Sequence, residues 1–217
     1  MRFHLVYSGR LPASANKSKP EDVRDIRDKF HPQLELLWKT HAALRRLRSS
    51  ARVLRNPEAD RLSYFEPPQS PFDREQDPAE PPDDAFVDLC EPIVKGGKSY
   101  MPLVRKSLDL NCSLKIMFLR QEDPGELVLQ GGDFDGRIKT LFDALRVPDA
   151  DVEEKYPQAQ NPTYCLLESD TLISSFDVST GRLLMPQTDH PHEVHLVVEA
   201  TIRVLRLGNW NVCLVGD

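Results

Sequence analysis

The chain has 217 residues, of which 29% are charged and 40% hydrophobic, with a formal net charge of −6. This composition is typical of a globular domain, and the negative charge is atypical of a protein that coats DNA. No stretch is apolar and long enough to predict a signal peptide or a membrane span, so we expect a cytoplasmic protein with no membrane partner.

The N-terminal half begins with a predicted strand, Phe3 to Tyr7, followed by a polar loop to about Pro20. A long helical region is predicted from about Glu21 to Arg55, with a kink or division at Pro32 because proline lacks the N–H that a helix needs. Residues 66–84 are rich in proline and acid and poor in apolar groups. We interpret them as an extended insertion within a single domain that covers 1–217.

The C-terminal half alternates strands with one clear helix. Two strands flanking Gly96 and Gly97 predict a hairpin. Further strands are predicted over Ser113–Leu119 and His195–Leu205, and a short last one over Asn211–Val215. Leu172–Val178 and Arg182–Met185 predict another hairpin, turning at Thr180 and Gly181. This order predicts an α+β fold, a mixed β-sheet with helices packed on one side.

The four cysteines, Cys90, Cys112, Cys165 and Cys213, lie far apart with no C-x-x-C spacing. That argues against a structural zinc site and predicts reduced thiols that pack as small hydrophobic side chains. His190, His192 and His195 lie close together in the sequence, but no second cluster completes a metal site. We expect these histidines to be hydrogen-bonded or solvent-facing.

The run from Gly131 to Pro148 is the most informative segment. Ile138, Leu141, Phe142 and Leu145 recur at helical spacing, while Asp135, Lys139, Asp143 and Arg146 form a second, polar stripe. Asp133 and Asp135 are predicted at a loop-to-helix junction, where two carboxylates can converge on Mg²⁺. Spacing alone also fits a capping aspartate followed by an i, i+4 ion pair on the surface.

This run resembles the signature of RusA-type Holliday junction resolvases, in which Asp-x-Asp-Asn opens a helix and a lysine follows four residues after the second aspartate. Glu168-Ser169-Asp170-Thr171-Leu172-Ile173 resembles the downstream acidic element of that family. The resemblance implies a RusA-like fold and a homodimer that acts as a Mg²⁺-dependent endodeoxyribonuclease on branched or structured DNA, with Mn²⁺ as a substitute ion. By matched position it makes Asp133, Asp135 and Asp170 metal ligands and Lys139 an auxiliary cation.

Two positions depart from the family pattern. Gly136 stands where the family has asparagine, and Ser169 stands where it has the first aspartate of a pair. Loss of a residue that supports a metal ligand elsewhere lowers affinity or activity about 10- to 100-fold. The alternative is therefore a RusA-like protein with weakened or no catalytic activity that binds nucleic acid or has a regulatory role.

Positive charge gathers in two places. Arg45, Arg46 and Arg48, with Arg52 and Arg55 beyond them, have no acidic neighbour in the sequence, and Arg137 and Arg146 flank the aspartate motif. We predict that these arginines contact DNA phosphates. For the first group, a solvated helix face or a contact with the acidic segment remains the alternative.

Overall fold

The computed structural model describes residues 1–12, 20–56, 61–62, 86–121, 131–149, 160–185 and 193–215, and only the backbone of 54–56, 61–62 and 131–133. The predicted insertion at 66–84 lies outside these residues. The main sheet has four strands in the order β1-β10-β7-β9. They are β1 (Arg2–Arg10), β7 (Leu110–Arg120), β9 (Ile173–Arg182) and β10 (Glu193–Val204). β10 is antiparallel to β1 and β7, whereas β9 is parallel to β7, so the sheet is mixed.

Two smaller sheets accompany the main one. The first contains β5 (Ile93–Lys95), β6 (Lys98–Val104) and β8 (Thr163–Leu167), and the second contains β2 (Arg52–Asn56), β3 (Arg61–Leu62) and β4 (Phe86–Asp88). The β5–β6 hairpin turns at Gly96 and Gly97, as predicted. Both glycines have positive φ, 53° and 72°, as a tight two-residue hairpin turn requires.

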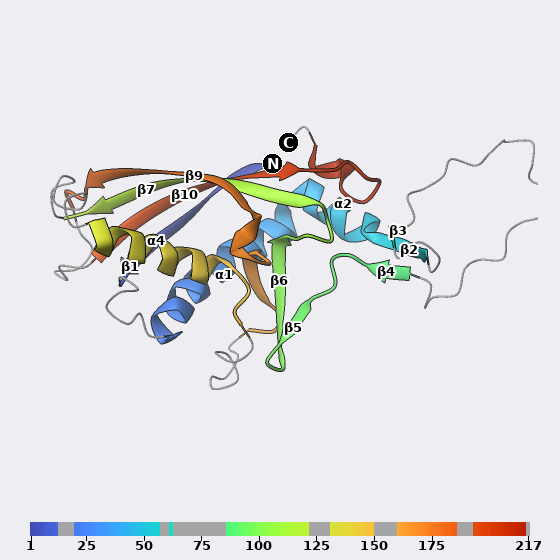
Figure 1. Cartoon of the computed structure of the whole chain (residues 1–217), viewed down its shortest axis with the longest axis horizontal. Coiled ribbons are helices and arrows are strands. Elements are labelled where there is room, and N and C mark those ends of the chain that lie inside the picture. The colour runs from blue at the N-terminus through green and yellow to red at the C-terminus, as the bar shows by residue number, and fades with distance from the viewer. Residues whose placement is uncertain are drawn as a thin grey trace, which may run out of the picture.

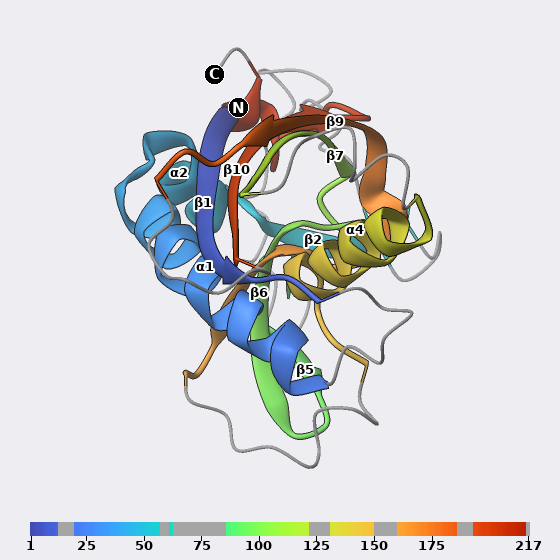
Figure 2. The ribbon, with the colours of Figure 1, turned by 90° about the vertical axis from the view of Figure 1, so that its left-hand side faces the viewer.

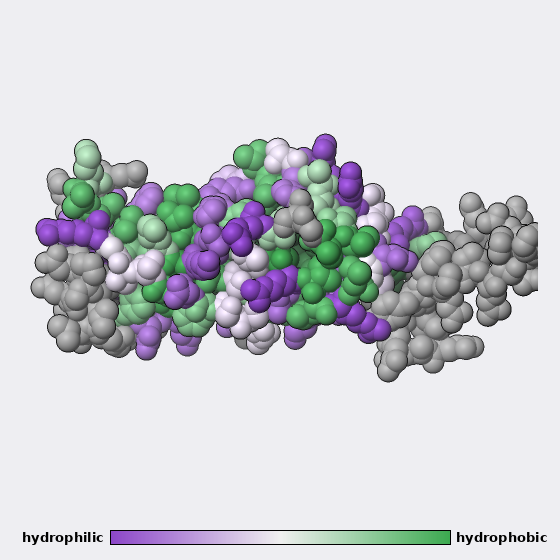
Figure 3. Space-filling model, turned by 90° about the horizontal axis from the view of Figure 1, so that it is seen from above, coloured by the Kyte–Doolittle hydropathy of each residue, from purple (hydrophilic) through white to green (hydrophobic). Residues whose placement is uncertain are grey.

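Helices α1 (Pro20–Thr40) and α4 (Gly131–Leu145) cover one face of the four-stranded sheet (Figures 1 and 2). Alternate residues of β7 are buried on that face, as in Leu114, Ile116 and Phe118, because side chains of a strand point alternately to its two faces. The α+β prediction is confirmed. Figure 3 views the opposite face, where charged and apolar residues are mixed.

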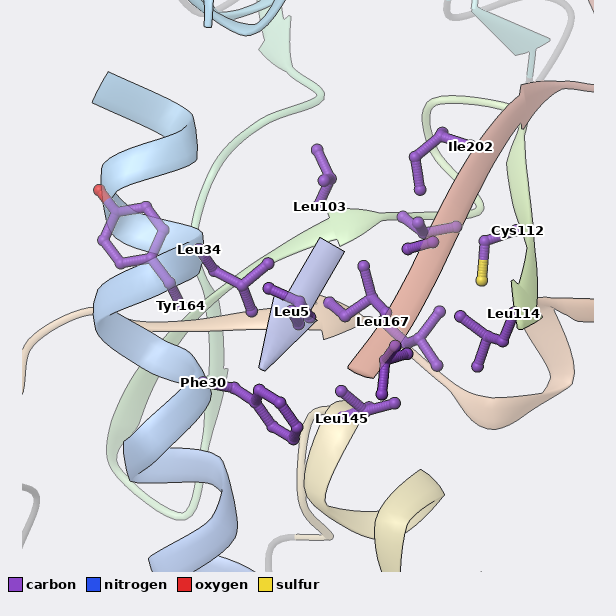
Figure 4. Packing of buried hydrophobic residues seen from close by; sticks show 14 of the residues in the cluster. Leu5, Phe30, Leu34, Leu103, Cys112, Leu114, Leu145, Tyr164, Leu167 and Ile202 are labelled. Atoms are coloured by element: carbon purple, nitrogen blue, oxygen red, sulfur yellow. The ribbon is translucent and has the colours of Figure 1, made fainter. Parts of the chain in front are cut away.

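The core lies between this sheet and the helices. Figure 4 shows Phe30 and Leu34 from α1 beside Leu5, while Leu114 of β7 lies on the other side of the same buried cluster, beyond Leu167 of β8. Cys90, Cys112 and Cys165 are buried and all four thiols are free, as expected. Burial raises the pKa of Cys90 to about 11 and that of Cys112 to about 12.

Three predicted elements were wrong. The helical region was expected to divide at Pro32, but Pro32 lies inside α1 and the division is at His41. The second helix, α2 (Ala42–Ser50), buries Ala43, Leu44 and Leu47. The expected hairpin at Thr180 and Gly181 is one continuous strand, β9, because β7 supplies hydrogen bonds along its whole length. The expected last strand is instead a 3-10 turn, η4 (Val212–Leu214). No helix in the described ranges is long and apolar enough to span a membrane.

His31 joins α1 to β8. Its Nδ1 accepts a hydrogen bond from the backbone N–H of Tyr164 at 2.9 Å, and its ring packs 5.6 Å from the Tyr164 ring. Burial lowers the pKa of His31, against the opposing effect of Glu35 and Asp28. The neutral imidazole is therefore the form that fits the fold.

We expect this histidine to make stability depend on pH. Because the unfolded state binds a proton near pH 6.5 and the folded state only at lower pH, stability should be full above about pH 6.5 and decline as the pH falls below it. His31→Gln should remove this decline while keeping an acceptor for Tyr164. Urea unfolding of both proteins across this pH range tests it, and equal slopes in the two would contradict it.

Candidate functional site

The aspartate motif lies inside a helix. α4 begins at Gly131, so the predicted loop-to-helix junction at Asp135 is wrong. Residues two apart in a helix are separated by roughly 200° around its axis and do not face each other. The local backbone therefore does not make positions 133 and 135 converge, and the side chain of Asp133 lies outside the described set.

The two stripes predicted for α4 are present. Ile138, Leu141 and Leu145 are buried in the core, with Phe142 packed partly against it. Asp135 and Lys139 are exposed one turn apart on the opposite side. Asp135 and Lys139 thus form a small polar face that solvent can reach.

Asp170 belongs to a different local structure. It begins the 3-10 turn η3 (Asp170–Leu172) between β8 and β9, and Ser169 caps this turn by accepting a hydrogen bond from the N–H of Thr171 at 3.3 Å. Glu168 accepts a hydrogen bond from the N–H of Lys106 at 2.9 Å. Local hydrogen bonding therefore accounts for Glu168 and Ser169, two residues of the predicted acidic element.

β9 runs antiparallel to α4, which decides where Asp170 lies. The rings of Phe176 and Phe142 are 5.2 Å apart. Four residues further along β9, Thr180 is paired with Phe118, whose ring lies 5.7 Å from Phe134 near the start of α4. Asp170, which precedes β9, therefore lies towards the C-terminal end of α4 (Figure 1).

The structure does not bring Asp170 next to Asp135. Arg146, just after α4, is bridged to Leu167, three residues before Asp170. From Asp135 to Arg146 is 146 − 135 = 11 residues, which corresponds to about 16 Å along a helix axis. Asp135 and Asp170 do not fit as ligands of one Mg²⁺ within a single chain. Among the described side chains, no group of three or more His, Cys, Asp or Glu is arranged to hold a metal ion.

The two arginines near the motif are engaged within the fold. Arg137 is 5% exposed and donates a hydrogen bond to the carbonyl of Leu11, so it attaches α4 to the end of β1. Arg146 bonds Asp143 at 3.0 Å and Asp149 at 2.9 and 3.2 Å. Asp149 and Asp143 raise the pKa of Arg146, and Arg146 lowers the pKa of Asp149. The expected phosphate contacts of Arg137 and Arg146 therefore lack support.

Helix α2 presents the predicted basic face. Arg45, Arg46 and Arg48 are exposed, while the opposite side of the helix is buried in the core. Arg52, at the start of β2, lies over the ring of Phe86, with its guanidinium carbon 4.6 Å from the centroid. Within the described part of the chain, no ion pair joins these three α2 arginines to an acidic residue.

A second basic group was missed by sequence reasoning. β1, β7 and β9 end at Arg10, Arg120 and Arg182, on the same side of the molecule as the start of α4. Arg120 is paired with Arg182, and Arg10 is paired with the buried Glu193. More than a hundred residues separate Arg10 from the other two in the sequence. Only the strand pairing shows that all three arginines lie at the same end of the strands.

A cavity of about 440 Å³ opens beside the Arg10 end of β1, and it is lined by Tyr7, Arg10, Asp22, Asp25, Asp28 and Lys29. The Tyr7 hydroxyl donates to the carbonyl of Arg10 at 2.6 Å. Burial raises the pKa of Tyr7 and that of Asp28. The lining has three carboxylates and two cations, so it has no strong preference for one sign of charge.

His195 shows the role expected for the late histidines. Its Nδ1 lies 2.6 Å from the Ser8 hydroxyl across the β1–β10 pair. The other two, His190 and His192, lie outside the described residues.

No family model, curated protein or solved structure matches this chain. The likeness to RusA-type resolvases thus rests on the two short motifs alone.

Arg146 provides a test of the arrangement around α4. We expect Arg146→Gln to lower the free energy of unfolding by about 1 kcal/mol, because it removes partly exposed ion pairs with Asp143 and Asp149. We expect DNA affinity to be unchanged, since this guanidinium is already bonded. Chemical denaturation and fluorescence anisotropy with labelled DNA measure the two effects. A large loss of DNA affinity at unchanged stability would restore Arg146 as a phosphate contact.

Proposed function

We propose that this protein binds DNA through the exposed arginine face of α2. The observation that supports it is the arrangement of Arg45, Arg46 and Arg48, which are solvent-exposed on a helix anchored through Leu44 and Leu47. Exposed guanidinium groups suit phosphate oxygens because each group presents several donors in a planar fork. Phosphate contacts of this kind bind the DNA backbone and carry no sequence information.

The net charge of −6 does not prevent such binding. Dissolved salt screens the attraction between exposed charges that lie more than about 10 Å apart. The attraction of a phosphate to α2 therefore depends on the charges close to it and not on the net charge of the chain. The three charged side chains that α2 exposes are all arginines, and the acid of the chain is concentrated elsewhere in the sequence. A local patch can therefore bind a polyanion on an acidic protein.

The test replaces three charges at once. Arg45→Gln, Arg46→Gln and Arg48→Gln together should weaken binding to a four-way junction and make the dependence of log K on log salt shallower by about 0.9 for each phosphate that is no longer neutralised. The matched control is Arg2→Gln, Lys115→Gln and Arg203→Gln, which removes the same charge from the open face of the main sheet. Equal decreases in affinity in both triple variants would show only a net-charge effect and contradict the proposal.

A second candidate, Mg²⁺-dependent endodeoxyribonuclease activity, is favoured by the exposed Asp135 and Lys139 one turn apart on α4. They lie on the same side of the molecule as the strand-end arginines Arg10 and Arg182. Lys139 can offset the charge that develops on a phosphate during hydrolysis, and the arginines can hold neighbouring phosphates. In this candidate Asp135, the exposed carboxylate of α4, acts without Asp170.

Two asparagine variants test this candidate. Asp135→Asn should abolish both Mn²⁺ binding, followed by electron paramagnetic resonance, and metal-dependent cutting of junction or flap DNA. Asp170→Asn should leave both unchanged, because the turn η3 lies far from Asp135 along α4. If Asp170→Asn also abolishes metal binding in a folded protein, the separation of these two residues does not hold in solution. DNA binding without cutting in the presence of any metal ion would contradict the nuclease candidate and support only the DNA-binding function.

A further inference from the structure

The two edges of the main sheet differ. At the β1 edge, the side-chain amide of Gln33 accepts a hydrogen bond from the N–H of Val6 at 2.9 Å and donates one to its carbonyl at 2.7 Å. Lys29 donates to the carbonyl of Ser8 at 2.6 Å. Side chains of α1 thus bond the outward backbone groups of β1 at Val6 and Ser8, and this blocks pairing with another strand.

The β9 edge lacks these protections. Among the described residues, β9 pairs only with β7, and Figure 2 shows it on the side of the sheet opposite to β1 and α1. The strand contains no proline or lysine, and its one register shift precedes Ser175. Proline, bulges and charged side chains, lysine above all, are features by which natural edge strands avoid pairing, and of these β9 has the charged residues Asp177 and Arg182. Most of the strand is solvent-exposed.

The direction of the free backbone groups follows from one hydrogen bond. The N–H of Leu183 donates to the carbonyl of Arg120 on β7. Backbone groups of successive strand residues alternate in direction, as their side chains do. The N–H and C=O groups of Phe176, Val178 and Thr180 therefore point away from β7.

We propose that β9 pairs antiparallel with β9 of a second copy of this chain, around a two-fold axis at Thr180, to form a continuous eight-stranded sheet. Such an axis places the residue n positions before Thr180 opposite the residue n positions after it. With this axis residues 178–182 of the two β9 strands pair directly, because β9 ends at Arg182. Beyond them Phe176, 54% exposed, lies opposite Leu184 of the second copy, 83% exposed, which follows the end of the strand, and each such pair covers apolar surface that one chain leaves in water. This is an isologous contact, so it occurs twice.

Electrostatics favours this axis over one centred three residues earlier. An axis at Asp177 would place the two Asp177 carboxylates directly opposite each other, which destabilises a strand pair. With the axis at Thr180 the two carboxylates lie about 20 Å apart along the strands, at the rise of an antiparallel strand. The proposal does not depend on DNA binding and can succeed or fail separately from it.

The first test measures the mass of the full chain by analytical ultracentrifugation. Thr180→Pro removes an outward N–H while leaving the hydrogen bonds to β7, and Thr180→Ala is its control. Phe176→Lys places a charge at the proposed contact and also removes the ring contact with Phe142 within the chain. We expect a wild-type dimer that persists in Thr180→Ala, and a dimer dissociation constant at least about tenfold higher in the other two.

Circular dichroism establishes whether each variant is folded. If Thr180→Pro does not fold, the result for Phe176→Lys decides the test. A wild-type protein that stays monomeric up to about 100 µM, or a dimer unaffected by Phe176→Lys, would overturn the proposal. The latter result would place the interface elsewhere. A complex with an extended peptide in place of a dimer would also overturn it.

Cross-linking tests the register. Two cysteines at directly opposite, hydrogen-bonded positions of antiparallel strands lie about 5.5 Å apart between their Cα atoms, within the range that a disulfide spans. In a Cys213→Ser background, Thr180→Cys should form a covalent dimer under mild oxidation, whereas Ser175→Cys, on the same strand, should not. Cross-linking of Ser175→Cys alone would contradict the axis at Thr180.

Discussion

Burial of one face of the main sheet under α1 and α4 is the constraint on which the other features depend. The buried side chains of β7 and β10 alternate along both strands. A shift of one residue in either strand would expose this whole set and bury polar groups such as Lys115 and Glu199. The register of the sheet is therefore strongly determined, and the strand ends that carry Arg10, Arg120 and Arg182 are determined with it.

The same constraint determines which parts of α4 are available to solvent. Because Ile138, Leu141 and Leu145 must face the sheet, Asp135 and Lys139 must face away from it. α4 is attached near its middle by Arg137, which bonds the carbonyl of Leu11, and just beyond its C-terminus by the backbone bond from Val147 to Leu167. Asp135 therefore lies in the first part of α4, away from the C-terminal end of the helix where η3 lies.

Sequence patterns were reliable where a segment's own residues decide its structure. The hairpin at Gly96 and Gly97 needs two positive φ angles, which glycine adopts at little cost. The apolar stripe of α4 and the strand predicted over His195–Leu205 were also correct. These patterns required no knowledge of which other segments lie nearby.

The errors arose where a distant segment decides the outcome. Thr180 and Gly181 read as a turn, yet pairing with β7 keeps β9 extended through them. Asp133 and Asp135 were predicted at a loop-to-helix junction, yet α4 begins before both of them. For the candidate site, the sequence identified the arginine cluster of which Arg45, Arg46 and Arg48 are exposed on α2. It did not show that Arg137 and Arg146 are bonded within the fold.

The sequence by itself determined the fold class, most of the strands and the two faces of α4, because hydrophobic periodicity and turn chemistry are local properties. Only the tertiary structure decided that β9 runs antiparallel to α4, and hence that Asp170 and Asp135 lie apart. It also decided that one edge of the sheet is closed by Gln33 and Lys29 while the edge at β9 has no such cover among the described residues. These are relations between segments far apart in the chain, and they follow from how the whole core packs.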